Sequence, residues 1–294
     1  MKLFHYVRRD GTENFGDRLN LWLWPQLLPH LDSVQDDTTW VGTGTLLNSL
    51  LPERLATQKA IIFSTGAGYE QPLTILPDGW QISCVRGPLT AKRLGLPQRA
   101  AIADGGLLIR QVFQGSSAKP FPVAFMPHIH HVADAFWEPL CLKLGWRYID
   151  PRWPVEPVLA AIDQSELLLA EAMHGAIAAD ALRVPWIPVH TSARILDFKW
   201  QDWCASMEVA YRPQRLPPPL TYKPVALGVR SGLRATRHWQ RCWQQGRWRQ
   251  SEAAIAAQLV EIAQQVSPTL SRQSVLDRRL GQLMDCLDQL QSTW

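Results

Sequence analysis

The sequence predicts an α/β protein with parallel sheets, and three observations support this prediction. Short apolar runs recur up to residue 189, and a glycine-rich or polar turn and then a helical pattern follow most of them. The run at residues 167–170 is apolar throughout, which is typical of a central parallel strand covered on both faces. The length of 294 residues suggests about two domains. We therefore expect two Rossmann-like parallel-sheet domains.

Changes in composition set the expected domain boundaries. Residues 114–122, QGSSAKPFP, are the best candidate for a linker, and a second series of strand–loop–helix units follows them. Residues 212–224 contain many prolines, which predicts an extended connector. We therefore expect a first domain over residues 1–118, a second over residues 119–225 and a helical C-terminal extension over residues 226–294.

The first domain begins with a strand at residues 3–7, and a polar loop leads from it to a helix over residues 19–31 with apolar residues at helical spacing. Asp17 can cap this helix, and Asn14 can form a turn. A polar loop between a strand and a helix is also where an open α/β sheet binds ligands. Both residues are therefore candidate site residues.

The next strands of this domain are expected at residues 39–41, 60–64, 81–85 and 100–103. Glycine-rich turns follow two of them, GTGT at residues 42–45 and TGAG at 65–68, and suggest a crevice lined by backbone N–H groups. Arg86 follows the strand at residues 81–85 and precedes a glycine and a helix. An arginine in this place can hold a phosphate or carboxylate, and its alternative role is a salt bridge.

In the second domain we expect strands at residues 123–126, 147–149 and 167–170 and a further strand that ends at residue 189. The strand at residues 167–170 leads through Glu171 and His174 into an alanine-rich helix. Free N–H groups at a helix start favour an anion, and Gly175 allows a ligand to approach the backbone. The alternative is that His174 only caps the helix.

Other polar groups follow strands of the same domain. His128 and His130 come after residues 123–126, and with Asp134 a metal site is conceivable. No third ligand has a diagnostic spacing, so we expect no metal and expect His128 to line a polar cleft. Four charged residues follow the last strand, and each can face the crevice or belong to a solvated helix face. They are Arg194, Asp197, Lys199 and Asp202.

The C-terminal extension carries a basic segment and two amphipathic helices. Residues 230–250 hold six arginines and no acid with tryptophans between them, which suits a membrane surface, a nucleic acid or a helix that packs its tryptophans inward. Amphipathic helices are expected over residues 251–266 and 274–291. Leucines at spacings of four and three in the second helix fit either a homodimer contact or packing on the body of the protein.

The overall composition places the chain among water-soluble proteins. The net charge of +4 suits an anionic substrate or a membrane surface and demands neither. Five widely spaced cysteines suggest reduced thiols, and neither a signal-peptide core nor an apolar run of membrane-span length is found. We expect a cytoplasmic protein, which leaves peripheral contact with the inner face of the membrane open, and no nucleic-acid partner.

Three groups of residues stand in order along the chain. They are NFGD at residues 14–17, then VRGPLT at 85–90 with LGL at 94–96 and IAD at 102–104, and finally MHG at 173–175 with VPWI at 184–187. Together they resemble the polysaccharide pyruvyl transferase family, most closely its bacterial exopolysaccharide ketal-forming members. The resemblance covers roughly residues 1–200.

This resemblance implies a glycosyltransferase-B-like fold with two Rossmann-like halves that face a cleft. It also implies transfer of a pyruvyl group from phosphoenolpyruvate to a sugar of an exopolysaccharide or cell-wall glycan, with formation of a cyclic ketal. The glycan acceptor can be lipid-linked, and phosphoenolpyruvate is the donor substrate, so we expect no cofactor. Many members of the family have Arg-x-His-Gly in the last motif, where this chain has Ala172. A replacement cation is then needed, and the candidates are His128, Arg152, Arg194 and Lys199.

The chemistry of phosphoenolpyruvate suggests roles for these residues. A phosphate and a carboxylate need cations and N–H donors, and ketal formation needs a general acid and a general base. We expect Arg86 and Gly175 to hold the donor, His174 to bind the phosphate or shuttle the proton, and Asp17 to act on the acceptor hydroxyl. Further substrate contacts are expected from Asn14, His128, Glu171 and Lys199.

Two other functions fit the same architecture. One is a sugar-nucleotide-dependent glycosyltransferase, although the sequence has no clear motif for a ribose or a base. The other is a non-catalytic glycan-binding or scaffold relative of the enzyme, which Ala172 favours.

Overall fold

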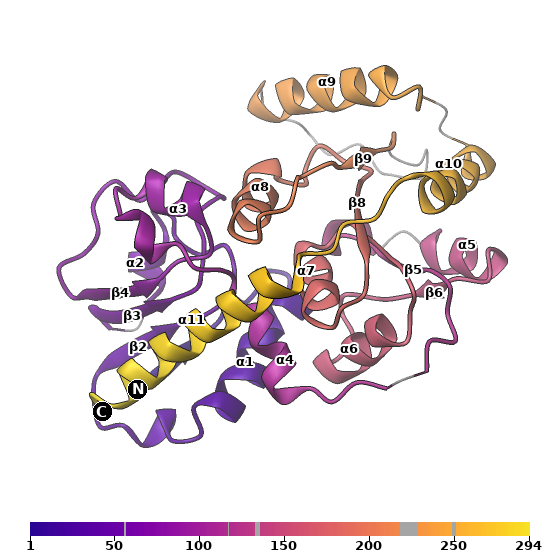
Figure 1. Ribbon diagram of the computed structural model, residues 1–294. Helices are drawn as coiled ribbons and strands as arrows, with labels where there is room; N and C mark the ends of the chain where they lie inside the picture. Colours follow the sequence, from indigo (N-terminus) through magenta and orange to yellow (C-terminus); the bar gives the residue numbers. More distant parts are fainter. Residues whose placement is uncertain (56, 117, 133–135, 218–228, 249–250) are drawn as a thin grey trace. The chain divides into compact units, whose positions relative to one another are not determined.

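The computed structural model describes residues 1–294 except residues 56, 117, 133–135, 218–228 and 249–250, and the side chains of residues 229–231 (Figure 1). The chain divides into two compact units. The first unit is Met1–Gln114, Asp197–Tyr211 and Ser271–Trp294, and the second unit is Gly115–Leu196 and Arg212–Leu270. Each unit contains a parallel sheet with flanking helices, so the predicted α/β fold is confirmed.

The sheet of the first unit has the strand order β1-β2-β3-β4 among the described residues. All its strand pairs are parallel. Because parallel strands end at the same edge of a sheet, the loops after β2, β3 and β4 lie together. The strands are β1 (Lys2–Phe4), β2 (Thr38–Val41), β3 (Lys59–Phe63) and β4 (Trp80–Cys84).

Helix α1 (Phe15–Leu27) covers this sheet through an apolar face. Leu19 and Leu23 lie one turn apart on that face and are fully buried. The helix begins at Phe15, four residues before the predicted start, and Asn14 occupies its N-cap position. The other helices of the unit are α2 (Leu51–Arg54), α3 (Pro88–Arg93), α4 (Ile109–Val112), α8 (Asp197–Ser206) and α11 (Gln273–Gln291).

Aromatic side chains fill much of the first unit. The ring of Trp24 lies edge-on to Trp40 and Phe63, with centroids 5.3 and 5.4 Å away, and Trp40 stacks on Phe63 at 5.1 Å. Trp294 adds a further edge contact to Trp40 at 6.1 Å. These contacts give several of the chain's tryptophans a packing role.

The predicted strand at residues 100–103 is not formed. Ala101 makes only an isolated parallel bridge to Val85, and a 3-10 turn, Gln98–Ala100, precedes it. Asp104 then accepts a hydrogen bond from the N–H of Gly106 and starts the next turn. The run is therefore too short to continue the ladder beyond β4.

The sheet of the second unit has the strand order β6-β5-β7-β8-β9, and all its pairs are parallel. Central β7 is buried along its whole length, as predicted for residues 167–170. Part of the predicted proline-rich connector pairs with β8 as strand β9. The strands are β5 (Ala124–Met126), β6 (Arg147–Tyr148), β7 (Leu168–Ala170), β8 (Trp186–His190) and β9 (Gln214–Arg215).

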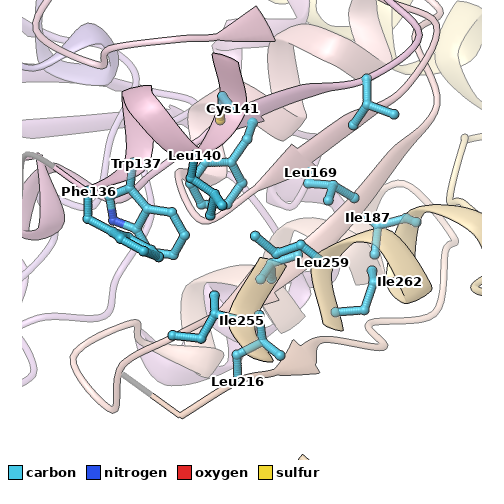
Figure 2. Packing of buried hydrophobic residues seen from close by; sticks show 13 residues of the cluster. Phe136, Trp137, Leu140, Cys141, Leu169, Ile187, Leu216, Ile255, Leu259 and Ile262 are labelled. Carbon is cyan, nitrogen blue, oxygen red and sulfur yellow. The ribbon is translucent and has the colours of Figure 1, made fainter. Parts of the chain in front are cut away.

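Helices on this sheet bury a mixed aliphatic and aromatic core (Figure 2). Trp137 and Leu140 of α5 and Ile255, Leu259 and Ile262 of α10 contribute to that core. The helices of the unit are α5 (Trp137–Lys143), α6 (Val155–Asp163), α7 (Met173–Ala181), α9 (Val229–Gln244) and α10 (Glu252–Gln265).

The C-terminal helices do not form the separate extension predicted for residues 226–294. Helix α10 packs into the core of the second unit, whereas α11 belongs to the first. The leucine stripe of α11 is buried by the chain itself, so it packs on the body of the protein, and a homodimer stays a prediction. An amphipathic helix lowers its free energy by covering an apolar face, and each of these helices covers a different sheet.

All five cysteines are free thiols. Among the described residues, we find no helix that combines the length and the apolar character needed to cross a membrane. The expectation that the two domains face each other across a cleft stays a prediction.

Candidate functional site

Arg86 joins the loops at the carboxyl edge of the first sheet. Its guanidinium donates to the carbonyl oxygens of Gly44 and Ala67, at 3.2 and 2.9 Å, and to the hydroxyl of Thr45 at 2.8 Å. These partners lie after β2 and β3, while Arg86 itself follows β4. The side chain is fully buried, so it works as an internal tie between three strand ends.

A carboxylate from a distant part of the chain completes this tie. Asp202 of α8 accepts from Arg86 Nε at 3.0 Å, and from the backbone N–H and hydroxyl of Thr90 at 2.9 and 2.5 Å. Both charged side chains have zero exposure, so the ion pair is fully buried. A buried ion pair needs such additional hydrogen bonds to offset its desolvation.

The glycines around Arg86 make room for this ion pair. A Cβ atom on Gly66 would lie 2.2 Å from Arg86 Cζ, and one on Gly87 would lie 2.2 Å from the carbonyl oxygen of Asp202. Gly66 belongs to one of the glycine-rich turns that were predicted to line a crevice, and here it approaches the guanidinium. The partners of Arg86 are therefore internal, and this geometry favours a structural role over the predicted contact with the donor.

Asn14 and Asp17 lie at the same end of the first unit. Asn14 Nδ2 donates to Asp17 Oδ2 at 2.8 Å, and both residues are partly exposed. Asn20 is buried one turn later and donates to the carbonyl oxygens of Asp17 and Thr43 at 3.3 and 3.1 Å. It accepts from Trp24 Nε1 at 2.8 Å, so this network fixes the start of α1 against the loop after β2.

Lys199 is a buried residue of α8 in the first unit. Its Nζ donates to the hydroxyl of Tyr69 at 2.9 Å and lies 5.2 Å from the centroid of the same ring. The side chain is 8% exposed. In the structure, the ammonium group of Lys199 is therefore bound to Tyr69. A contact between Lys199 and the substrate stays a prediction.

Glu171 joins the loops at the carboxyl edge of the second sheet. One of its oxygens accepts from the N–H and hydroxyl of Thr191, which follows β8, at 2.8 and 2.6 Å. The other accepts from the N–H of His128, after β5, at 3.1 Å and lies 2.8 Å from His131 Nδ1. Glu171 itself follows β7 and is fully buried, so it ties three strand ends together.

The pKa of Glu171 reflects two opposing effects. Burial raises it, but the positive charge of His131 and the hydrogen bonds from His131 and Thr191 outweigh burial and hold it at about 2. Glu171 is therefore ionised at neutral pH and can only accept hydrogen bonds. It follows that His131 Nδ1 carries a hydrogen and donates it.

Three histidines gather beside Glu171. The ring of His128 lies 5.0 Å from that of His130 and 5.8 Å from that of His131, measured between centroids. His128 Nδ1 accepts from the backbone N–H of His130 at 3.4 Å, so a neutral His128 ring carries its hydrogen on Nε2. His130 is exposed, whereas His128 and His131 are buried. Imidazole N–H groups next to a sheet edge are suitable donors to an anion.

His174 and Gly175 lie in the first turn of α7, directly after β7. His174 is partly exposed at this edge. Gly175 is buried, its N–H donates to the carbonyl oxygen of Ala172 at 3.0 Å, and a Cβ atom there would lie 2.5 Å from Met126 Sδ. This contact with β5 gives Gly175 a packing role, and the expected approach of a ligand to its backbone stays a prediction.

Two arginines proposed as replacement cations also belong to the second unit. Arg152 donates through Nε and Nη2 to the carboxylate of Asp150, at 2.6 to 3.1 Å, and this pair occupies its guanidinium. Arg194 is exposed in the loop after β8, three residues beyond Thr191. Arg194 is therefore better placed than Arg152 to meet an anion at the edge where Thr191 contacts Glu171.

The structure thus groups the predicted site residues by unit. Asn14, Asp17, Arg86 and Lys199 belong to the first unit, and His128, Glu171, His174 and Gly175 to the second. Sequence reasoning missed Asn20, His131 and Thr191, which hold the site residues in place. It named Asp202 only as a charge of the crevice or of a solvated helix face, whereas Asp202 is buried and paired with Arg86. The run HIHH at residues 128–131 contains His131, so the sequence offers a signal for that residue. The sequence of the helix that contains Asp202 offers no signal that Arg86 is its partner.

A metal site finds no support in the described part of the chain, where no three side chains of His, Cys, Asp or Glu are grouped in a way that could hold an ion. Asp134, the third residue of the conceivable metal site, lies outside the described residues.

No family model matches the chain. Among solved structures, it is similar to the UDP-GlcNAc 2-epimerase of Methanocaldococcus jannaschii, crystallised with UDP-GlcNAc and UDP, at 9% identity and a TM-score of 0.39. The match covers 94% of this chain and 83% of the epimerase. A likeness of this size carries no argument about function.

A curated relative gives a much stronger match. The chain is 45% identical over 221 residues to the succinoglycan biosynthesis protein ExoV of Rhizobium meliloti (strain 1021). The aligned region covers 74% of this chain and 68% of that protein. Identity of this size over most of both chains establishes common descent. The chain belongs to the family of that protein, the polysaccharide pyruvyl transferase family whose motifs its sequence resembles.

Proposed function

We propose that this protein is a biosynthetic transferase of exopolysaccharide synthesis that transfers the pyruvyl group of phosphoenolpyruvate to a sugar as a cyclic ketal. The observation that carries the proposal is the 45% identity to a succinoglycan biosynthesis protein. The histidines at the carboxyl edge of the second sheet support it, because the donor has two anionic groups that need N–H donors.

The reaction places defined demands on the protein. Two sugar hydroxyl oxygens bond to the central carbon of the donor, and phosphate leaves that carbon. Both hydroxyl groups lose their protons. In the overall balance, one proton is added to the methylene carbon, which becomes a methyl group, and one proton leaves with phosphate. The protein must therefore supply a general acid, a general base and donors for the departing phosphate.

The partly exposed residues are the best candidates for these roles. His174 binds the phosphate or shuttles the proton, because an imidazole can serve as acid and base near neutral pH. The exposed His130 and Arg194 supply an imidazole and a guanidinium as further hydrogen-bond donors, in place of the arginine that the family motif has at Ala172. Asp17 acts on the acceptor hydroxyl, and Asn14, which donates to its carboxylate, positions it.

The test is an assay with the full chain, phosphoenolpyruvate and a soluble or lipid-linked glycan, in which phosphate release and ketal formation on the glycan are followed. We expect acceptor-dependent release of phosphate and a decrease of about 10²- to 10⁴-fold in the His174→Ala variant. His30→Ala is the matched control, because His30 is an exposed histidine of the other unit. Equal rates for wild type and His174→Ala would remove His174 from the mechanism.

One observation favours a second candidate, a non-catalytic glycan-binding relative. Ala172, at the N-cap of α7, stands where many family members have an arginine. This candidate predicts glycan binding without phosphate release. The same assay with nucleotide sugars tests the glycosyltransferase alternative, which predicts nucleotide release.

A further inference from the structure

Basic residues are concentrated in one part of the chain. Residues 209–251 contain nine of the 30 lysines and arginines and none of the 26 aspartates and glutamates. Since the whole chain has a net charge of +4, the remaining residues have a net charge of −5. Residues 209–251, the basic segment, are therefore positively charged in a protein whose remaining residues have a negative net charge. Helix α9 is the main element of this segment among the described residues.

Helix α9 is fixed to the second unit by one face. Cys242 is fully buried and His238, one turn earlier, is 4% exposed. His238 Nε2 lies 2.9 Å from the carbonyl oxygen of Leu216, and the side chain of Gln245 accepts from the N–H of Arg215 at 2.9 Å. Figure 1 shows α9 beside β9. The first bond joins α9 to the residue after β9, and the second joins the residue after α9 to β9. The opposite face of the helix points away from the sheet.

Two flanks of different chemistry border the outward face of α9. Arg234, Arg237 and Arg241 follow each other at spacings of three and four residues, so they share one flank, and all three are exposed. Trp239 and Trp243, four residues apart, share the other flank and are 37% and 73% exposed. Leu233 lies between the flanks and Trp248 follows the helix, and they are 58% and 59% exposed.

We propose that α9 and the turn after it form a docking surface for an anionic lipid bilayer, with the helix axis parallel to the membrane. Charge complementarity identifies the occupant, because a segment with nine basic residues and no aspartate or glutamate attracts lipid phosphates. Tryptophan prefers the headgroup region, where its ring is apolar and its N–H remains hydrated. None of the candidate site residues belongs to this surface.

Alternative occupants fit less well. Single-stranded nucleic acid also binds arginines and aromatic rings, but it uses a basic groove that tracks the backbone, with rings on which successive bases stack. On α9 the arginines and the tryptophans lie on separate flanks, which suits a flat surface that contacts both. A nucleic acid is therefore treated as an outcome of the test.

Flotation of the purified full chain with lipid vesicles tests this surface. The vesicles contain either phosphatidylcholine alone or phosphatidylcholine with phosphatidylglycerol. We expect binding to the anionic vesicles only and strong weakening by salt. The Arg234→Gln/Arg237→Gln/Arg241→Gln variant should bind about 100-fold more weakly, because each such arginine contributes about five-fold.

A matched variant removes the same charge from elsewhere on the surface. Lys92→Gln/Arg99→Gln/Lys143→Gln changes three exposed residues outside the basic segment and should bind vesicles as the wild type does. Trp243→Ala/Trp248→Ala should reduce the binding that remains at high salt. All substituted residues are exposed, and the unfolding midpoint of each variant confirms that it is folded.

Three results would overturn the proposal. The first is absence of binding to anionic vesicles, and the second is equal loss of binding in the two charge variants. The third is tight binding of a single-stranded oligonucleotide that anionic vesicles do not displace, which would assign the surface to nucleic acid.

Discussion

The carboxyl edges of the two sheets have the same design with opposite charge. In the first unit a buried arginine, Arg86, donates to the loops after neighbouring strands, and in the second unit a buried glutamate, Glu171, accepts from them. Each charge also has an internal partner, Asp202 for Arg86 and His131 for Glu171. A charged residue directly after a strand can therefore organise the edge from within.

This comparison separates two kinds of motif residue. Arg86, Glu171 and Gly175 are buried and have internal partners or close neighbours, so they set the shape of the edges. Asn14, Asp17 and His174 are partly exposed and can meet a substrate. Exposure, which a motif does not reveal, decides which of its residues can act on a ligand.

The largest effect is expected when the internal pair of the first edge is broken. Arg86→Ala leaves the Asp202 carboxylate buried without its ionic partner, which should lower the free energy of unfolding by about 3–5 kcal/mol. Denaturant unfolding measures this change. Arg99→Ala, at an exposed arginine of the same unit, is the control and should stay within about 0.5 kcal/mol of wild type. A loss below about 1 kcal/mol for Arg86→Ala would contradict the internal role of Arg86.

The second edge should lose stability in acid. The pKa of Glu171 is about 2 in the folded protein and 4.5 in the unfolded chain, so its ionisation stabilises the fold above pH 4.5 and this contribution is lost as pH falls towards 2. The full contribution corresponds to about 3 kcal/mol, of which about 2 kcal/mol is lost by pH 3. Unfolding at pH 6 and pH 3 measures it.

The Glu171→Gln variant identifies the group responsible. It keeps an acceptor for Thr191 but has no carboxylate to protonate, so its stability should change less between pH 6 and pH 3 than that of the wild type. Glu53→Gln removes an exposed carboxylate and should leave the pH dependence of the wild type unchanged. Identical pH dependence for Glu171→Gln and the wild type would refute the assignment.

Much of this fold could be predicted from the sequence. The central strand β7 was visible as an apolar run, and most strands were found near their observed places because parallel strands leave continuous apolar patterns. The strand predicted at residues 100–103 was wrong, because a short apolar run also suits a single bridge beside a turn. Helices α10 and α11 were found, but amphipathic patterns do not reveal which sheet a helix covers.

The position of the candidate site could be predicted from the sequence, but the roles of its individual residues were harder to predict. Strand ends and helix starts led to His174 and Asp17, since ligands bind at such edges. The partner of Arg86 is 116 positions away, at Asp202. No local pattern encodes an ion pair between such distant residues. The partner of Glu171 lies in the histidine run at residues 128–131, where the sequence suggested polar groups without their hydrogen bonds.

The smallest effect is expected for Gly175→Ala, in a comparison of two glycines. In Gly66→Ala the new methyl group would lie 2.2 Å from Arg86 Cζ, and in Gly175→Ala it would lie 2.5 Å from Met126 Sδ. Overpacking costs about 1–3 kcal/mol, and Gly66→Ala should fall at the upper end because hydrogen bonds hold the guanidinium. Gly175→Ala should fall at the lower end, because a methionine side chain adapts its shape.

A second substitution tests the cause of the smaller effect. Met126→Ala removes the sulfur atom that the new methyl group would meet, so Gly175→Ala should be less destabilising in that background than in the wild type. A double-mutant cycle from denaturant unfolding isolates this coupling. Additive losses would show that the contact with Met126 is not the cause of the destabilisation by Gly175→Ala, and would contradict the packing role of Gly175 against β5.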